Sequence, residues 1–213
     1  MQKCTLCTCV QQFLFKAMHS MQKVGKYWQH IPNNKYYELC ITCGIIVSMD
    51  HILIHCWATP RQIIWQLTEA LWPHAHIPWP KITLSTLLGS GTIAPPDNNP
   101  QKDQGDRNSR TQIARARGAC RLLQILLSKG THLIWVLRCE RVIKDTNHWH
   151  PEEIHTHWLR AINLHLTKDK LYATKIKCNK DTYQLVRNTW QPVLQQIRNL
   201  PNNWVHHSEV LVG

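Results

Sequence analysis

Four potential metal ligands lie close together in the sequence, and their spacing constrains the fold of this chain more than any other feature. Cys40, Cys43, His51 and Cys56 follow the pattern C-x2-C-x7-H-x4-C. Thiolate and imidazole ligands in a closed set of four are typical of structural zinc, whereas a catalytic zinc usually keeps one position open. We therefore predict a small zinc-knuckle module that holds one Zn2+. The alternative is that these cysteines are small buried apolar residues that bind no metal.

The sequence predicts the conformation of the turn around the first two cysteines, but it leaves the identity of the fourth ligand open. A C-x2-C pair fits a tight turn whose backbone N–H groups point at the sulfurs, and Gly44 directly after it can adopt positive φ without steric cost. His51 and His55 would share one helix face, which makes His55 an alternative ligand to Cys56. Cys56 lies roughly 140° round an ideal helix from His51, so this pair requires the helix to begin or distort there. We favour Cys56, because thiolate is the better zinc ligand and H-x4-C after C-x2-C repeats the spacing of retroviral-type zinc knuckles.

The remaining cysteines help to predict the cellular compartment of the protein. The chain has nine cysteines and no apolar stretch typical of a signal peptide at its start. Without export, cysteines are more often metal ligands or buried thiols than disulfides. Cys4, Cys7 and Cys9 could join the first cluster or bind a metal alone, although no second ligand pair lies within the usual distance. No apolar run reaches the ~18–20 residues of a membrane span. We expect an intracellular protein of the nucleus or cytoplasm, neither secreted nor transmembrane.

Apolar residues spaced three and four apart predict a mostly α-helical fold with long C-terminal helices. The stripes place helices at residues 10–23, 60–71, 111–144, 151–166 and 181–198, with a short segment at 82–88. Residues 111–144 fit one long helix or two stacked ones, and Gly130 is the weak point where the helix could kink or break. Pro192 predicts a bend or a late restart in the last helix.

Residues 90–110 are rich in Gly, Pro, Asn and Asp, and they form the clearest linker. They divide the chain into an N-terminal helix with its connector (1–35), a zinc-binding module with the following helix (36–89), the linker, and a basic helical region (111–213). The sequence leaves open whether residues 13–89 and 111–213 form one body or two.

The charge balance indicates a polyanionic partner. Lys and Arg number 25 against 13 Asp and Glu, so the net charge is +12 with neutral His. Such a surplus favours nucleic acid first and anionic membrane second, and we predict RNA or DNA and no membrane. The residues that could contact phosphates as a ridge on the long helix are Arg107, Arg110, Arg115, Arg117, Arg121, Arg138, Arg141 and Lys144. The alternative for such a run is a solvated charged face.

Motifs of common enzyme classes are missing from the sequence. It has no G-x-x-x-x-G-K-[ST] phosphate loop, no G-x-S-x-G nucleophile turn and no carboxylate cluster for two-metal nuclease chemistry. The histidine-rich run at 148–157 lacks the H-E-x-x-H order of a zinc protease helix. We therefore expect a non-catalytic protein.

A series of short motifs runs along nearly the whole chain after about residue 12. They are residues 13–19, Cys40-x2-Cys43-Gly44, His51-Ile52-Leu53-x2-Cys56, Ile64-Trp65, Pro78-Trp79-Pro80, residues 132–143, residues 161–163, Thr189-Trp190 and Leu211-Val212-Gly213. In this order they resemble the C-terminal part of the reverse transcriptase polyprotein of fungal non-LTR retrotransposons, from the end of the RNase H region onward. The segment around Trp135 to Ile143 is the most specific of them.

This resemblance implies a reverse transcriptase zinc-binding domain with Cys40, Cys43, His51 and Cys56 as its ligands. It implies the nucleic-acid-binding tail of a retroelement protein, whose remaining reverse transcriptase and RNase H parts would be partners. Those catalytic parts are absent from this chain, so the resemblance implies no catalytic activity here. The alternative function is a helical protein-interaction or structural remnant that does not bind nucleic acid.

Overall fold

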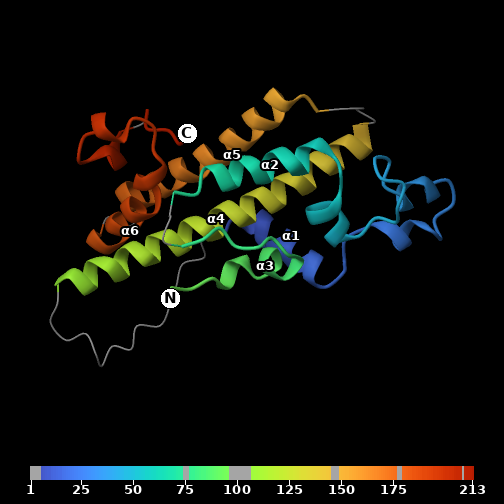
Figure 1. Ribbon diagram of the computed structural model, residues 1–213, viewed down its shortest axis with the longest axis horizontal. Helices are drawn as coiled ribbons and strands as arrows, with labels where there is room; N and C mark the ends of the chain where they lie inside the picture. Colours follow the sequence, from blue (N-terminus) through green and yellow to red (C-terminus); the bar gives the residue numbers. More distant parts are fainter. Residues whose placement is uncertain (1–5, 74–76, 96–106, 145–148, 177–178, 208) are drawn as a thin grey trace.

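The computed structural model describes residues 6–73, 77–95, 107–144, 149–176, 179–207 and 209–213, which fold mainly into helices (Figure 1). The α-helices are α1 (Thr8–Met18), α2 (Thr59–Ala70), α3 (Leu84–Leu88), α4 (Arg107–Lys144), α5 (Pro151–Leu171) and α6 (Lys180–Trp190). Shorter 3-10 and π turns are η1 (Gly25–Trp28), η2 (Lys35–Glu38), η3 (His51–His55), η4 (Ser90–Thr92), η5 (Tyr172–Ile176), η6 (Gln191–Val193), η7 (Ile197–Asn199) and η8 (Trp204–His206). Extended pairing in the described residues is confined to two isolated antiparallel bridges, Leu39–Ile46 and Leu194–Val212. The mostly α-helical prediction is therefore confirmed.

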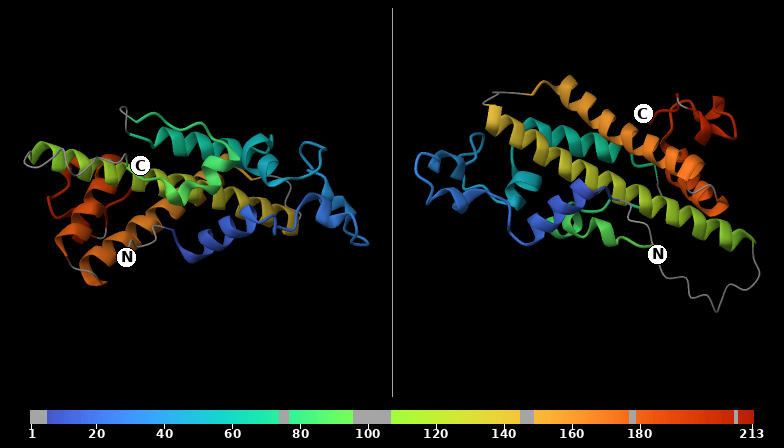
Figure 2. Two further views of the ribbon diagram at one scale, coloured as in Figure 1. Left: turned by 90° about the horizontal axis from the view of Figure 1, so that it is seen from below. Right: turned by 180° about the vertical axis from the view of Figure 1, so that it is seen from behind.

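Helix α4 runs along the length of the molecule, and the other helices pack against it (Figures 1 and 2). Its 38 residues span about 57 Å at ~1.5 Å per residue. Helices α2 and α5 lie on one side, α1 and α3 on the opposite side, and α6 contacts the N-terminal half. The helix continues through Gly130 without a break, so of the two predicted alternatives the structure shows one long helix. A Cβ added at Gly130 would lie 3.1 Å from Cζ3 of Trp65. The missing side chain at Gly130 therefore lets α2 pack closely against α4.

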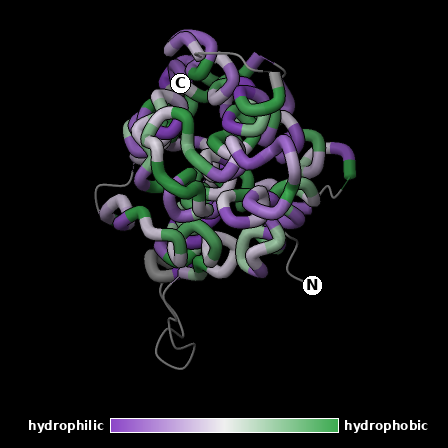
Figure 3. Tube along the Cα trace, turned by 90° about the vertical axis from the view of Figure 1, so that its right-hand side faces the viewer, coloured by the Kyte–Doolittle hydropathy of each residue, from purple (hydrophilic) through white to green (hydrophobic). Residues whose placement is uncertain are grey.

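One hydrophobic core joins the segments that the sequence divided into four. Its fully buried members include Ile64 of α2, Leu122 and Leu126 of α4, Ile154 of α5 and Trp190 of α6. Within this core, Trp158 Nε1 of α5 donates to Thr68 Oγ1 of α2 at 3.0 Å. The helix that follows the Cys/His cluster thus belongs to the same body as the basic helical region. Seen along the long axis of the molecule, hydrophobic and hydrophilic stretches alternate along the chain (Figure 3).

The linker predicted at 90–110 is shorter than expected. Gln124 Nε2 of α4 donates to the Ile93 carbonyl at 2.6 Å, so the start of the predicted linker lies against the helix. At its other end α4 begins at Arg107, four residues before the predicted boundary. Residues 96–106 lie outside the described residues.

Helix α1 ends earlier than its apolar stripe predicted, at Met18 instead of residue 23. Ser20 has a φ of 55°, and the N–H groups of Ser20 and Met21 donate to the carbonyls of Ala17 and Lys16 at 3.3 and 2.8 Å. This pair of bonds is the Schellman arrangement, whose left-handed position is usually taken by glycine. The boundary was missed because a serine takes that position here.

Prolines mark helix ends as the sequence predicted. Helix α5 begins at Pro151, and Pro60 lies in the first turn of α2. The predicted helix 181–198 ends at Trp190, because Pro192 lies in the short turn η6 that follows.

A buried polar network ties α4, α5 and α6 together. Arg121 donates from Nη1 and Nη2 to the two carboxylate oxygens of Asp169, at 2.7 Å each. Trp190 Nε1 donates to Asp169 Oδ2 at 2.6 Å. Because its guanidinium is engaged by this bidentate pair inside the fold, Arg121 is not the surface phosphate contact that we expected.

Candidate metal centre

The loop that carries Cys40 and Cys43 is a tight turn closed by backbone hydrogen bonds. Cys40 N–H donates to the Ile45 carbonyl at 2.8 Å, and Gly44 N–H donates to the Cys40 carbonyl at 2.7 Å. Gly44 has a φ of 70°, so the predicted positive φ is confirmed. A Cβ added at Gly44 would meet nothing within 4 Å, so the backbone conformation and not the available space requires glycine here. We call residues 39–46 the metal turn.

A single π turn places His51 and Cys56 on the same side of the chain. Turn η3 is closed by the Cys56 N–H, which donates to the His51 carbonyl at 2.7 Å, five residues back instead of four. This is the distortion that a His51–Cys56 pair requires. His55 lies outside the cluster, because its exposed ring places Nε2 3.1 Å from Asp50 Oδ2. The structure therefore brings Cys56, and not the alternative His55, to the other ligands.

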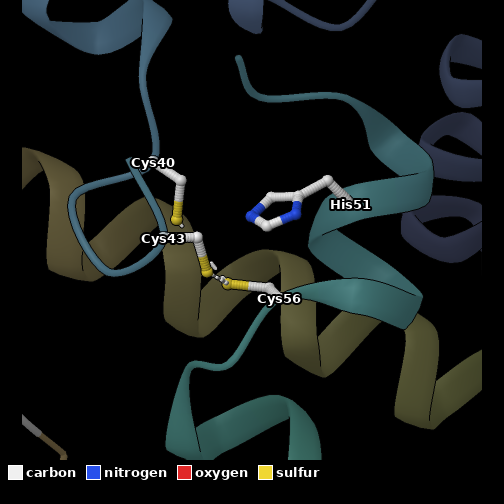
Figure 4. A group of neighbouring side chains, drawn as sticks. All are labelled: Cys40, Cys43, His51 and Cys56. Carbon is white, nitrogen blue, oxygen red and sulfur yellow. Dashed lines mark hydrogen bonds between the residues drawn. The ribbon is translucent and has the colours of Figure 1, made fainter. Parts of the chain in front are cut away.

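Cys40, Cys43, His51 and Cys56 come together as the sequence predicts (Figure 4). One ligand atom from each lies within 4.8 Å of all the others. The Cys56 sulfur lies 3.7 Å from that of Cys40 and 3.9 Å from that of Cys43. A tetrahedral ion with sulfur ligands at ~2.3 Å has sulfur–sulfur edges of about 3.8 Å, so these separations fit. Among the described residues this is the one group of three or more His, Cys, Asp or Glu side chains arranged to hold a metal ion.

The His51 ring supplies a second test of the fit. It is buried, with 4% of its surface exposed, and it points toward the three sulfurs (Figure 4). Neither ring nitrogen has a hydrogen-bond partner among the described residues. A buried polar group left without a partner costs about 1–3 kcal/mol, and a bond from one nitrogen to a metal ion removes that cost for that nitrogen. The residues present therefore fit a metal ion.

The thiols of the cluster differ in pKa. Burial acts to raise the pKa of Cys40, but the adjoining His51 ring and the backbone N–H groups of Thr42 and Cys43 outweigh it and lower the pKa to about 6. At Cys56, burial and the negative charge of Cys40 raise the pKa to about 12, despite a backbone N–H from Ala58. Metal binding requires thiolates, and a divalent cation offsets the repulsion between them.

Two arginines connect the centre to the helices around it. Arg61, in the first turns of α2, donates from Nε to the Cys56 carbonyl. Arg141, near the end of α4, donates from Nη1 to Thr42 Oγ1 at 2.9 Å. The metal centre is thus attached to α2 and α4 by one arginine from each helix.

The predicted basic ridge is divided, and its N-terminal part lies far from the metal centre. Arg110, Arg115 and Arg117 are exposed on the first half of α4, whereas Arg121 binds Asp169 inside the fold. Arg107 is the first residue of α4, and its side chain lies outside the described part of the chain.

The C-terminal part of the ridge lies beside the metal turn. Arg138 and Arg141 are half-buried there, about 45 Å from Arg110 at ~1.5 Å of helix rise per residue. Lys144 ends α4, and its side chain is not among those described. The eight basic residues therefore do not form one surface.

A pocket of about 520 Å³ lies between residues 36–61 and the last turns of α4. Three of the metal ligands line it, together with apolar side chains and the cations Arg61, Arg138 and Arg141. Neither Arg61 nor the pocket was predicted from the sequence. The pocket is built from two segments that are distant in the chain, and a lone arginine on an expected helix has no distinguishing pattern.

The second cysteine group does not join the metal centre. Cys7 and Cys9 lie at the start of α1 with their sulfurs 2.9 Å apart, and Lys129 Nζ lies 3.4 Å from Cys7 Sγ. Neither residue is among the ligands of the centre. Cys4 lies outside the described residues.

In the described residues, no helix combines the length and apolar character needed to cross a membrane. Comparison of the chain with models of known protein families, with curated proteins and with solved structures gave no match. The functional evidence therefore comes from the residues of the site itself.

Proposed function

We propose that this chain is a non-catalytic nucleic-acid-binding protein whose metal turn is closed by one structural zinc ion. The observation that carries the proposal is the closed set of four protein ligands next to arginines that have no carboxylate partner in the described part of the chain. Bound zinc would supply a fixed crosslink between the metal turn and turn η3. The chain's own residues would supply the binding surface that this crosslink holds in place.

The choice of zinc rests on the donor set. Three thiolates and one imidazole suit zinc better than magnesium or calcium, which prefer oxygen ligands. All four positions are filled by protein atoms in this arrangement, which is typical of structural sites. A site with no position for water or substrate favours a non-catalytic role.

The choice of nucleic acid rests on charge. The chain carries +12, and among the described residues Arg61, Arg138 and Arg141 form no ion pair with a carboxylate. Exposed Arg110, Arg115 and Arg117 add positive charge at the other end of α4. A nucleic-acid-binding role also agrees with the resemblance to the zinc-binding tail of a retrotransposon reverse transcriptase.

Elemental analysis of the purified protein tests the metal. We expect about one equivalent of zinc per chain, as one closed Cys3His site binds one ion. Changing Cys40 and Cys43 together to serine should remove it, whereas changing Cys120, which lies outside the cluster, to serine should not. A folded protein without zinc would contradict the proposal.

A salt titration tests nucleic-acid binding. Affinity for RNA or DNA should fall steeply with salt, because each phosphate contact releases a counterion and adds about 0.7–0.9 to the slope of log affinity against log salt. Absence of binding to single-stranded or duplex RNA and DNA at low salt would contradict the proposal.

One observation favours the alternative function of a protein-interaction module. Ile41, Ile45 and Ile46 in the metal turn are exposed, Ile41 by 79%, although they are large apolar residues. Exposed apolar patches mark docking surfaces for other proteins. Binding to the remaining parts of a retroelement protein, with no affinity for nucleic acid at low salt, would support this alternative.

A further inference from the structure

The pocket beside the metal centre has a charge that its own residues do not balance. Among the described residues, its lining contains Arg61, Arg138 and Arg141 but no Asp or Glu. The zinc ion proposed above, with three thiolates and a neutral imidazole, would carry a net charge of about −1. Three arginines therefore leave a positive excess in a space of about 520 Å³, which is within the usual range of ligand pockets. We call this space the arginine pocket.

Two of the guanidinium groups have capacity for an anion. Arg141 is held by Thr42 through Nη1, but its Nε is buried and has no hydrogen-bond partner. The Arg138 guanidinium lies 5.5 Å from the centroid of the Trp135 ring, and burial lowers its pKa. Arg61, by contrast, is oriented by the Cys56 carbonyl. An anion bound between Arg138 and Arg141 would satisfy a donor that the protein leaves unpaired.

A row of aromatic rings leads to this pocket. Ring centroids are 5.1 Å apart for Tyr27 and Trp28, 5.2 Å for Trp28 and Tyr37, and 4.1 Å for Tyr37 and Tyr36. Tyr36 and Tyr37 also line the pocket. We call these four residues the aromatic array. It lies in the part of the chain that projects beyond the C-terminal end of α4 (Figures 1 and 2).

The two ends of the aromatic array are open to solvent, and its surroundings are basic. Tyr27 is 45% exposed and Tyr36 is 65% exposed. Residues 22–37 contain three lysines and no Asp or Glu, and Lys23 Nζ lies 5.6 Å from the centroid of the Tyr27 ring. Aromatic rings beside cations are the combination by which proteins hold unpaired bases and their phosphates.

We propose that the aromatic array and the arginine pocket form one track for single-stranded nucleic acid. Bases stack on the exposed rings of Tyr27 and Tyr36, and one unpaired nucleotide enters the pocket with its phosphate between Arg138 and Arg141. This inference rests on the nucleic-acid-binding function proposed above and adds its location and its class of ligand. A duplex does not fit this track, because its bases are already stacked on one another and are not free to enter a pocket.

The direct test measures binding of fluorescein-labelled 15-nucleotide oligothymidylate, oligouridylate and a 15-base-pair duplex by anisotropy at low salt. The full chain should bind both single strands more tightly than the duplex, and comparison of the two single strands distinguishes DNA from RNA. Tyr27→Leu combined with Tyr36→Leu keeps the apolar volume and removes the rings. It should weaken single-strand binding by about tenfold or more, because each stacked base contributes substantially.

Two further variants test where on the protein the single strand binds. Arg141→Gln should weaken single-strand binding by several-fold, and its zinc content should stay at that of the unaltered chain. Lys175→Gln combined with Lys180→Gln removes two exposed charges from η5 and the start of α6, outside the track, and should leave single-strand affinity within about twofold. The opposite pattern, with loss only in the Lys175/Lys180 variant, would overturn the track.

Photocrosslinking of the unaltered protein gives a result that does not depend on the folding of any variant. Oligothymidylate that contains 5-iodouracil should crosslink to Tyr27, Trp28 or Tyr36, as identified by mass spectrometry. Crosslinks confined to residues 107–121 would overturn the track and leave the proposed function standing. No binding of any nucleic acid at low salt would overturn both.

Discussion

His165 is a buried histidine whose surroundings favour its neutral form. It is 7% exposed, and its Nε2 lies 3.8 Å from Asp169 Oδ1. Burial is the largest influence and lowers its pKa to about 4. The Asp169 carboxylate acts in the other direction, while Lys129, Arg121 and Lys168 act with burial. Because Arg121 already engages both carboxylate oxygens, Asp169 offers His165 little compensation for protonation.

We expect the protein to lose stability as the pH falls from about 6.5 toward 4. An unfolded histidine has a pKa of about 6.5, so between these values the unfolded chain binds more protons than the folded chain, and the free energy of unfolding decreases. The contribution of His165 is fully present above pH ~6.5, and about 3 kcal/mol of it is lost by pH ~4. Urea unfolding at several pH values measures this. His165→Gln should show a smaller decrease, and identical pH dependence in both proteins would contradict the expectation.

At the scale of elements, the contact between α4 and α6 depends on a residue without a side chain. A Cβ added at Gly118 would lie 2.5 Å from the backbone C and O atoms of Asn188. Backbone atoms inside a helix cannot move aside as a side chain can. At Gly130 the nearest atom to an added Cβ is at 3.1 Å and belongs to the Trp65 side chain.

This difference predicts opposite outcomes for two similar substitutions. Helix propensity alone would make either Gly→Ala change stabilising by about 1 kcal/mol. We expect Gly118→Ala instead to destabilise by about 1–3 kcal/mol, because α6 must move away from α4. Gly130→Ala should stay within about 1 kcal/mol of the unaltered chain. Thermal or urea unfolding of the two variants measures both effects, and equal stability of the two would show that α6 shifts at little cost.

The ends of helices and turns were predictable where a single local sequence rule determines them. Pro60 and Pro151 mark helix starts that the structure confirms, and Gly44 has the positive φ expected after a C-x2-C turn. The end of α1 was not predictable, because Ser20 takes a position that glycine usually takes. The spacing of His51 and Cys56 predicted that this pair needs a distorted helix. No local pattern in the sequence indicated that the distortion is a π turn.

At the scale of the whole molecule, the metal centre lies at one end and most of the core lies elsewhere. The core along α4, α5 and α6 contains buried residues such as Leu122, Ile162 and Trp190, which are distant in sequence from the ligands. Stability is seldom uniform across such a structure, and a region held by few apolar contacts opens first. The metal turn is that region here, because its isoleucines are exposed.

Removal of the proposed zinc ion should therefore loosen one end of the protein and leave the other folded. We expect hydrogen exchange to accelerate in residues 36–58 after treatment with a chelator, and to change little in α5 and α6. Chelator saturated with zinc beforehand is the control for effects unrelated to metal removal. Uniform acceleration along the whole chain would show that the ion is required for the entire fold.

The candidate site as a whole could be predicted only in part. The four ligands were predictable, because they lie within one short segment with a recognisable spacing. Arg121 could not be assigned correctly, because its partner Asp169 lies on a helix 48 positions further along the chain. The arginine pocket joins residues 36–61 to the end of α4, and only tertiary packing brings these segments together.

The length of α4 sets a size for any ligand that contacts both of its ends. The exposed arginines of its first half and the half-buried arginines beside the metal turn are separated by about 45 Å along the axis. A nucleic acid that spans less than this distance reaches one end of the helix at a time. One that neutralises both groups of arginines at once therefore needs a span of about 45 Å, which equals the length of about 13 stacked base pairs at ~3.4 Å per pair.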